Sequence, residues 1–352
     1  MEPSLATAAT GFVGADYPWL DVPLGKALST QHGHALLVHG PDGVGQFEFC
    51  LRLAQAWLCE HADRVPGAPA CGVCASCHLV AAQVHPDLLV LVPEALREPL
   101  GWGAADNESA DSGEEKKSKT KPSAEIKVDA VRRAVAFAQQ TSARGCCKVI
   151  VIYPADRMNA VSANTLLKTL EEPPGAARFI LGAGQVEGLL PTIRSRCQAF
   201  RLDLPDVSAA QNWLTQRGLK QPDVALAASG GEPLTALDHA RQGLDADTWV
   251  KLPRLVQAGQ AGPLANWPVA LVVDTLQKLC LDLTLLSLGQ APRYFPANSL
   301  PKGIPTRRLV GWSGSLRKSR RQADHPLNAL LQIENLVMQA QQALTGAVLP
   351  PT

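Results

Sequence analysis

Four short apolar runs, separated by longer amphipathic segments, organise the first 200 residues. The runs are continuous rather than alternating, and they cover residues 35–38, 88–92, 149–152 and 179–181. Such runs are typical of strands buried on both faces of a parallel sheet. Segments with helical periodicity lie between them, at residues 48–59, 128–140 and 161–172. This order predicts an α/β, doubly wound domain.

The pattern changes after residues 204–205, where we expect the strands to stop. Residues 206–240 indicate a small helical unit, in which Gly230-Gly231 ends one helix and Glu232-Pro233 begins the next. Longer helical periodicity fills the remainder. We therefore expect three domains: an α/β core over 1–204, a small helical domain over 205–244 and an all-α domain over 245–352.

One segment of the core does not fit the alternation. Residues 101–125 are rich in Gly, Ser, Asp, Glu and Lys and hold almost no large apolar residue after Trp102. A composition that buries so little apolar area favours a disordered surface insertion.

Composition limits the class of protein. The 352 residues include 33 basic and 32 acidic ones, and a net charge of +1 argues against a wholly basic nucleic-acid coat, although local patches remain open. The first ten residues lack a basic start and a long apolar stretch, and no apolar run approaches the roughly 20 residues needed to cross a bilayer. We expect a cytoplasmic protein, whose nine cysteines are metal ligands or buried thiols.

A glycine loop follows the first apolar run. Its sequence, Gly40-Pro41-Asp42-Gly43-Val44-Gly45-Gln46-Phe47, has the glycine spacing of the nucleotide-binding P-loop. In a working loop a lysine reaches the β- and γ-phosphates and a hydroxyl holds Mg²⁺. Gln46 and Phe47 stand at those two positions and supply neither. The loop of Gly40, Gly45, Gln46 and Phe47 is therefore predicted to be degenerate, with no productive binding of ATP.

The second element of a phosphate site is also missing. The apolar run 149–152 should end at the acidic residues that position Mg²⁺ and water, but Tyr153-Pro154-Ala155-Asp156 follows it. Asp156, displaced beyond these positions, is interpreted as a cap or turn residue.

Four cysteines form a candidate metal site. Cys71, Cys74 and Cys77 are separated by two-residue spacers, and Cys59 lies upstream. Four thiolates suit tetrahedral Zn²⁺ of a structural kind. An iron–sulfur cluster and unliganded thiols remain alternatives, although the Cys-Pro of a ferredoxin run is absent. Cys50 could replace Cys59 as the fourth ligand.

Two groups of cations are also candidates. Arg196, within Thr192-Ile193-Arg194-Ser195-Arg196-Cys197, is either a surface ion-pair former or a finger directed at a neighbour's γ-phosphate. The second group lies within residues 302–321 with Trp312 and without an acid, and is either a solvated loop or a contact for nucleic acid. Its members are Lys302, Arg307, Arg308, Arg317, Lys318, Arg320 and Arg321.

Taken together, the motifs resemble the delta-prime subunits of the bacterial DNA polymerase III clamp loader, which belong to the AAA+ clamp-loader family. The resemblance covers residues 15–200 well, apart from the insertion, and the rest in outline. The motifs that carry it occur in family order: Tyr17-Pro18-Trp19, His34-Ala35-Leu36-Leu37, the cysteine loop, His85-Pro86-Asp87, Ile126-Lys127-Val128-Asp129, the Ser162–Pro174 string SANTLLKTLEEPP and Ser195-Arg196-Cys197.

The resemblance implies an AAA+ (RecA-like) core carrying a zinc loop at 59–77, a helical lid and a helical collar. It implies a hetero-oligomeric ring with delta and gamma/tau subunits that opens the sliding clamp and places it on primed DNA. Arg196 would complete the ATP site of an adjacent gamma/tau subunit, while this chain hydrolyses no ATP itself. Ser162 and Asn164 would face DNA. Independently of the resemblance, the basic stretch adds Arg317, Lys318, Arg320 and Arg321 as candidates for contact with DNA.

Alternatives remain at this stage. Ser162 and Asn164 could simply belong to a capped helix packed on the sheet. The whole chain could be an active gamma-like AAA+ ATPase, or a zinc-dependent DNA-binding protein on a vestigial ATPase fold.

Overall fold

The computed structural model describes residues 17–62, 65, 67–102, 122–322 and 328–346. The chain forms two compact units, Met1–Leu204 and Pro205–Thr352. Most of the predicted insertion, residues 103–121, lies outside the described residues.

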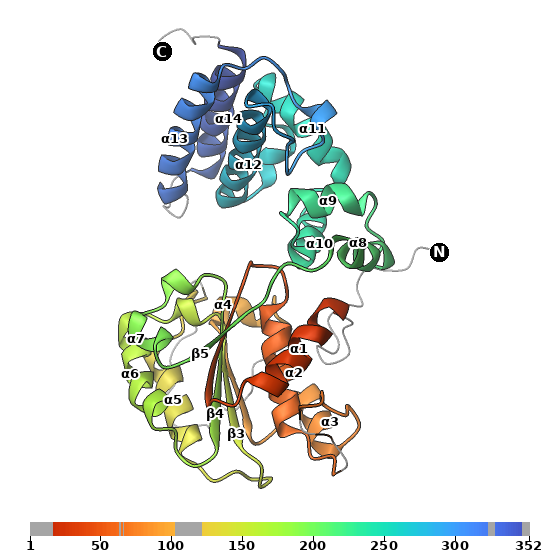
Figure 1. The fold of residues 1–352 in the computed structure, drawn as a ribbon. Coiled ribbons are helices and arrows are strands. Elements are labelled where there is room, and N and C mark those ends of the chain that lie inside the picture. Colours follow the sequence, from red (N-terminus) through yellow and green to blue (C-terminus); the bar gives the residue numbers. More distant parts are fainter. Residues whose placement is uncertain (1–16, 63–64, 66, 103–121, 323–327, 347–352) are drawn as a thin grey trace, which may run out of the picture. The chain divides into compact units, whose positions relative to one another are not determined.

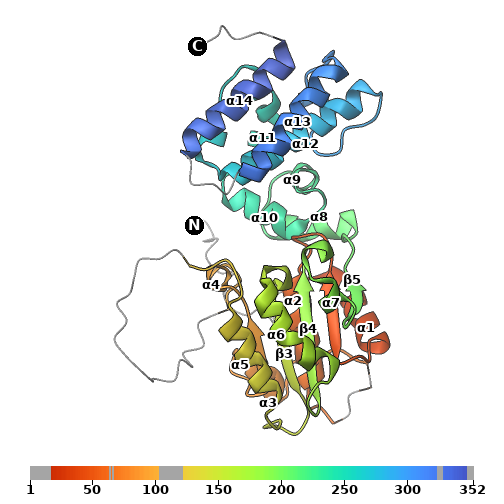
Figure 2. The same ribbon diagram turned by 90° about the vertical axis from the view of Figure 1, so that its left-hand side faces the viewer.

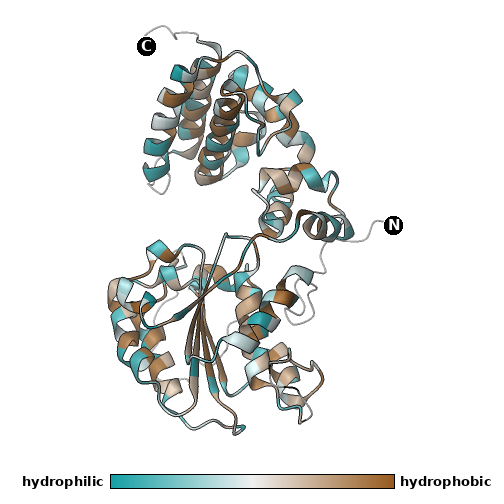
Figure 3. Ribbon diagram, viewed as in Figure 1, coloured by the Kyte–Doolittle hydropathy of each residue, from teal (hydrophilic) through white to brown (hydrophobic). Residues whose placement is uncertain are grey.

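The first unit is built on a five-stranded sheet in which every neighbouring pair is parallel, with the order β2-β3-β4-β1-β5 (Figure 1). The four predicted runs form four of these strands, and Figure 3 shows how apolar the central strands are. The strands are β1 (Ala35–His39), β2 (Leu88–Leu91), β3 (Lys148–Ile152), β4 (Ala177–Ala183) and β5 (Gln198–Arg201).

The fifth strand was not predicted. Gln198, Ala199 and Arg201 of β5 are exposed, so the strand lacks the continuous apolarity of a strand buried on both faces. It pairs on one side only, with β1, and therefore lies at the edge of the sheet. Its one buried residue, Phe200, stacks on Phe49 with ring centroids 5.4 Å apart.

Helices cover both faces of the sheet. In Figure 1, α1, α2 and α3 lie on one side and α5, α6 and α7 on the other. Two separate hydrophobic clusters fill the layers between helices and strands. The helices are α1 (Asp21–Thr30), α2 (Gln46–Leu58), α3 (Ala75–Ala81), α4 (Glu94–Arg97), α5 (Val128–Ala138), α6 (Ala160–Glu171) and α7 (Pro191–Arg194).

The second unit is helical (Figure 2). As predicted, Gly230 and Gly231 follow the end of one helix with positive φ angles of 75° and 93°, and the next helix begins with Glu232 at its N-cap position and Pro233 in its first turn. The helices are α8 (Val207–Gln216), α9 (Pro222–Ala228), α10 (Pro233–Arg241), α11 (Ala246–Gln257), α12 (Val269–Ser287), α13 (Thr306–Gln322) and α14 (Ala329–Thr345).

The longer helices of the second unit enclose one apolar core. Within it Trp249 stacks on Phe295 at a centroid distance of 4.2 Å. The fully buried Asp282 accepts hydrogen bonds from the backbone N–H groups of Arg293, Tyr294 and Phe295, each at 2.8 Å, and so fixes the connection after α12.

The predicted fold class, a parallel-sheet core followed by an all-α part, is confirmed. No helix among the described residues is both long and apolar enough to cross a bilayer.

Candidate functional site

The glycine loop connects the end of β1 to the start of α2. It therefore lies at the carboxyl ends of the parallel strands, where ligands bind in such folds. Gly40 is required sterically, because a Cβ there would lie 2.2 Å from the carbonyl oxygen of Leu202. Gly45 has a φ of 101° and caps α2, a conformation that glycine adopts without strain. The backbone of a P-loop is therefore present.

Gln46 occupies the interior of this loop. Its side-chain amide donates to the carbonyl oxygen of Gly40 at 2.9 Å and also to that of Pro41, and the residue is 1% exposed. The indole N–H of Trp19 donates to the carbonyl oxygen of Val44 at 2.8 Å. Neutral side chains thus hold the loop closed from within, at the position where a lysine would extend toward phosphate.

Phe47 belongs to the hydrophobic core. It is 1% exposed, and its ring centroid lies 5.1 Å from that of Tyr153 and 6.2 Å from that of Trp102. Tyr153 directly follows β3, and Pro154 and Ala155 after it occupy the positions where the Mg²⁺-binding acids of a working site would stand. At the position of the metal-binding hydroxyl, Phe47 therefore contributes an apolar ring to an aromatic cluster in the core, and neither residue 154 nor residue 155 supplies an acid.

Two carboxylates near the carboxyl ends of the strands also oppose the binding of a triphosphate. Burial raises the pKa of Asp42, and the nearby charge of Asp156 raises it further, while Arg157 opposes the shift. Asp42 packs against Gly184, beyond the end of β4, so closely that a Cβ on that glycine would lie 2.1 Å from the carboxyl. Two acids close together disfavour a polyanionic triphosphate. The sequence indicates only a cap or turn residue at Asp156, and it does lie in a short 3₁₀ turn, Ala155–Arg157.

The four predicted metal ligands converge. The Sγ atoms of Cys59, Cys71, Cys74 and Cys77 all lie within 4.8 Å of one another, with Cys59–Cys74 at 4.0 Å and Cys71–Cys77 at 3.9 Å. Tetrahedral bonds of about 2.3 Å place sulfurs about 3.8 Å apart, so the donor set fits a metal ion of that kind. Cys50, the alternative fourth ligand, lies apart in the core. The structure therefore selects Cys59.

Backbone N–H groups in the cysteine loop donate hydrogen bonds to these sulfurs. Backbone N–H groups point at three of them, from Cys71 to the sulfur of Cys59 at 3.4 Å, from Cys74 to that of Cys71 at 3.3 Å and from Cys77 to that of Cys74 at 3.4 Å. Burial acts to raise the pKa of the Cys59 thiol, but hydrogen bonds from the backbone of Cys71 and His61 outweigh it, so the pKa is lowered. Such donors favour the thiolate, the form that binds metal.

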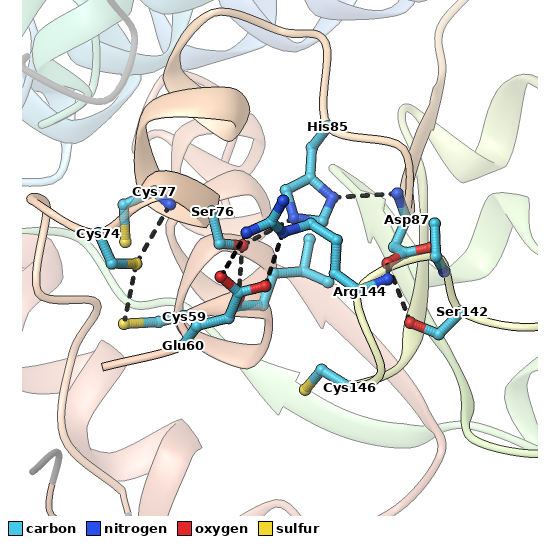
Figure 4. Close-up of polar contacts among 12 residues, drawn as sticks. Cys59, Glu60, Cys74, Ser76, Cys77, His85, Asp87, Ser142, Arg144 and Cys146 are labelled. Atoms are coloured by element: carbon cyan, nitrogen blue, oxygen red, sulfur yellow. Dashed lines mark hydrogen bonds and ion pairs between the residues drawn. The ribbon is translucent and has the colours of Figure 1, made fainter. Parts of the chain in front are cut away.

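A hydrogen-bond chain joins the cysteine loop to the sheet (Figure 4). The backbone N–H of Asp87 donates to His85 Nδ1 at 3.0 Å, so the ring proton is on Nε2, which donates to Ser76 Oγ at 2.7 Å. Ser76 in turn donates to the carbonyl oxygen of Leu58. In this tautomer the histidine accepts no proton from the serine, so the arrangement anchors the loop and activates no nucleophile.

Asp87 anchors the end of this hydrogen-bond chain that lies away from the cysteine loop. It is fully buried and accepts hydrogen bonds from Ala143 N–H at 2.7 Å, Arg144 N–H at 2.9 Å and Ser142 Oγ at 2.9 Å, and it pairs with Lys148 at 3.0 Å. Burial acts to raise the pKa of Asp87, but these donors and Lys148 outweigh it and lower the pKa to about 2. In the sequence, His85 and Asp87 stand out only as part of a family motif.

Arg196 lies between α7 and β5 at the surface of the first unit. Its Nε donates to Glu171 Oε1 at 2.7 Å, its Nη2 contacts the same oxygen, and its Nη1 donates to the carbonyl oxygen of Thr192 at 2.8 Å. Its side chain is 29% exposed, and Glu171 is the last residue of α6. The guanidinium is thus held in one orientation at the surface by an ion pair, which was the alternative interpretation from the sequence.

The two candidates on α6 differ. Ser162 is fully buried, and its Oγ donates to the carbonyl oxygen of Ile126 at 3.0 Å while Asn159 caps its N–H. The expectation that the Ser162 side chain faces DNA is therefore wrong, because the hydroxyl ties α6 to the segment before α5. Asn164 is exposed, and Lys168, one turn further along, is exposed on the same face.

The basic stretch is also different from its expected form. Residues 306–322 form α13 rather than a loop. Trp312 is 3% exposed within the core of the second unit, so it is not available to stack on a base. Arg320 donates to the carbonyl oxygen of Ala270 at 3.2 Å, whereas Arg317, Lys318 and Arg321 are exposed.

A parallel sheet with a P-loop backbone after its first strand, closed by Gln46 and Phe47, defines a P-loop-type protein whose own nucleotide loop is degenerate. Comparisons with known proteins agree. The family model described as "DNA polymerase III, delta subunit" matches residues 24–206, just over half of the chain. The chain belongs to the DNA polymerase III delta-prime family.

Curated relatives carry the same name. The DNA polymerase III subunit delta′ of Pseudomonas aeruginosa is 38% identical over 234 residues, 65% of this chain and 62% of that protein. The Escherichia coli K12 subunit delta′ is 30% identical over 74% of this chain and 76% of its own length. The DNA polymerase III subunit tau of Salmonella typhimurium is 30% identical over 79% of this chain but only 37% of its own length.

Among solved structures, a DNA polymerase III gamma subunit-related protein from Thermotoga maritima aligns with 92% of this chain and 99% of its own. Its sequence identity is 15% and its TM-score 0.47.

Proposed function

We propose that this protein is a non-hydrolysing subunit of a DNA polymerase III clamp loader, which helps to place the sliding clamp on primed DNA during replication. The observation that carries the proposal is the closed glycine loop, in which Gln46 donates to the carbonyls of Gly40 and Pro41. Family membership supplies the context, and a DNA polymerase III tau subunit is among the relatives, matched over 79% of this chain. The chain contributes to an ATP-driven assembly without turning over ATP itself.

Its chemical contribution is Arg196. An arginine supplied in trans neutralises charge that develops on the transferring γ-phosphoryl group, and such a residue is worth roughly 10³–10⁵ in rate. The ion pair with Glu171 keeps the guanidinium pre-oriented. A pair so exposed is worth about 0–1 kcal/mol, so its release toward a neighbouring gamma/tau subunit's nucleotide costs little.

The cysteine cluster has a structural role in this proposal. Zn²⁺ held by Cys59, Cys71, Cys74 and Cys77 would supply four bonds that fix the loop between α2 and α3. The four-ligand set has no position for water or substrate, as expected of a structural centre. The anchoring of Ser76 by His85 supports a role in folding.

The remaining expected partners follow from the same role. This chain would form the ring together with delta and gamma/tau subunits, and the assembled ring would engage the sliding clamp. We expect the assembly in the cytoplasm. Asn164 and Lys168, exposed on α6, are the side chains that would face DNA inside the ring.

Equilibrium binding of a fluorescent ATP analogue with Mg²⁺ to the isolated chain tests the proposal against an active gamma-like ATPase. We expect no saturable binding up to high micromolar analogue. A gamma/tau subunit with an intact P-loop, measured in the same buffer, is the positive control. Micromolar affinity for this chain would overturn the proposal. A third reading, a zinc-dependent DNA-binding protein, would instead lose DNA binding when the metal is chelated.

A further inference from the structure

The helix α13 carries an unusual bias of charge. From residue 283 to residue 323 the sequence contains eight cations and no carboxylate, although the whole chain is nearly neutral. The acids that bound this stretch are Asp282, which is buried, and Asp324, which lies outside the described residues. The positive charge is therefore not balanced along the sequence.

One face of α13 is fixed by packing. Leu309, Trp312 and Leu316 are 0–3% exposed in the core of the second unit. Their spacing of three and four residues marks a single side of the helix. The helix packs against α12 and α14. The opposite side is consequently the one turned to solvent.

The solvent side forms a cationic stripe, which we define as Arg307, Arg317, Lys318 and Arg321. At 100° per residue these four fall within one sector of about 100°, and all four are exposed. None of them makes an ion pair with any residue that the structure describes. Arg320 and Arg308 lie outside the stripe, because Arg320 donates to Ala270 and Arg308 is half-buried beside Gly346.

The middle of the cationic stripe carries no charged side chain. Gly314 lies in the same sector as the four cations and Gly311 lies just beside it, and a Cβ at either would meet nothing within 4 Å. Between Arg307 and the group at 317–321 the same side of the helix carries no charged residue, and Val310, which is 61% exposed, is the large side chain there. By the helical rise, Arg307 and Arg321 are about 21 Å apart along the axis, which is about six base-pair steps of duplex.

We propose that the cationic stripe of α13 binds the phosphodiester backbone of nucleic acid, through charge and without reading sequence. A uniform polyanion suits a stripe without carboxylates, and three of the four cations are arginines, whose planar fork pairs with phosphate oxygens. With Trp312 buried, no base stacks here, so the contact is to phosphate alone. The choice of DNA as the polymer rests on the proposed function.

The slope of affinity against salt tests the contact directly. Each phosphate neutralised contributes about 0.9 to the slope of log K against log [salt] for duplex DNA. Fluorescence anisotropy of the full-length chain with a labelled 20-base-pair duplex, between 25 and 200 mM NaCl, gives that slope. The triple variant Arg317→Gln/Lys318→Gln/Arg321→Gln should lower its magnitude by about 2.7.

A matched control removes the same charge elsewhere in the second unit. Arg241, Lys251 and Arg254 are exposed, and their triple Gln variant has the same net charge as the stripe variant. We expect it to keep the wild-type slope. The charge-conserving variant Arg317→Lys/Arg321→Lys should also keep it, and melting curves confirm that each variant folds.

An unchanged slope in the stripe variant would overturn the proposal. Equal loss in the matched control would do the same, since it would show that only net charge matters. Competition by polyglutamate as strong as that by DNA would indicate an acidic protein partner instead. The assay contains no partner subunit and no ATP, so its failure leaves the role of Arg196 untouched.

Discussion

The carboxylate of Glu171 holds the guanidinium of Arg196, with Oε1 accepting from Nε at 2.7 Å. Glu171 ends α6 and Arg196 follows α7, so the contact joins two helices that lie on the same face of the sheet. The backbone carbonyl of Thr192 holds a second nitrogen of the same guanidinium. The arginine is thus presented at the surface in a defined orientation, without being buried.

Gln46 should be important for stability although it belongs to a degenerate motif. Replacing it with alanine leaves the carbonyls of Gly40 and Pro41 without their side-chain donor in a buried loop, at a cost of about 1–3 kcal/mol. Gln46→Lys keeps a donor at this position and should lose less stability. Urea unfolding of both variants measures the difference. Equal stability of Gln46→Ala and wild type would show that the loop does not depend on these bonds.

The same lysine variant should not regain nucleotide binding. Phe47 still supplies no hydroxyl, the aromatic Tyr153 still follows β3, and Asp42 and Asp156 still oppose a triphosphate. We expect the ATP analogue to bind Gln46→Lys no better than wild type. Micromolar binding by this single variant would show that the missing lysine was the only defect.

Metal content should depend on the four converging cysteines alone. Cys59→Ser removes one sulfur of the cluster and should reduce bound zinc, measured by inductively coupled plasma mass spectrometry, and lower the melting temperature. Cys146→Ser is the matched control, because Cys146 is exposed and not among the four. Retention of a full equivalent of tightly held zinc by Cys59→Ser would contradict the assignment of this ligand.

Asp87 should control stability in acid. Its pKa is about 2, below the ordinary value of 3.8, so its ionised form stabilises the fold above about pH 4 and this contribution disappears as pH falls through about 2. The shift corresponds to about 2 kcal/mol. At pH 7 Asp87→Asn should cost about 3–5 kcal/mol, because Lys148 stays buried without its partner.

The pH profile separates this effect from a general loss of packing. The difference in unfolding free energy between Asp87→Asn and wild type should shrink as pH falls from 4 to 2. Asp129→Asn is the control, since Asp129 pairs with Arg132 at the surface and its replacement should change stability by less than about 1 kcal/mol. A difference that stays constant with pH would contradict the role of the ionised carboxylate.

Local pattern was sufficient for much of the core. Continuous apolar runs located four strands, and cysteine spacing located a cluster that the structure brings together. β5 was missed because Gln198 and Arg201 are exposed on an edge strand, where apolarity is not required. Cys146 was expected to be buried and is exposed.

The contacts inside the glycine loop could not be predicted from the sequence, because they depend on the tertiary structure. The sequence showed what Gln46 and Phe47 lack but not what they contact. The motif alone suggests a DNA-facing role for Ser162, whereas its burial depends on how α6 packs beside Ile126. Trp312 was grouped with its cationic neighbours in sequence, although helical geometry turns it to the opposite side.

The most direct test counts the ATP molecules hydrolysed per assembly in a single round of clamp loading, with Arg196→Ala in a ring reconstituted from this chain and its gamma/tau and delta partners. Arg194, exposed two residues away, provides the matched Ala variant. The proposed role predicts that Arg196→Ala folds and assembles, but loses the hydrolysis of one ATP per ring, with at least a 10³-fold slower rate at that site. Arg194→Ala should keep the full count. A full count at the wild-type rate with Arg196→Ala would contradict the central claim.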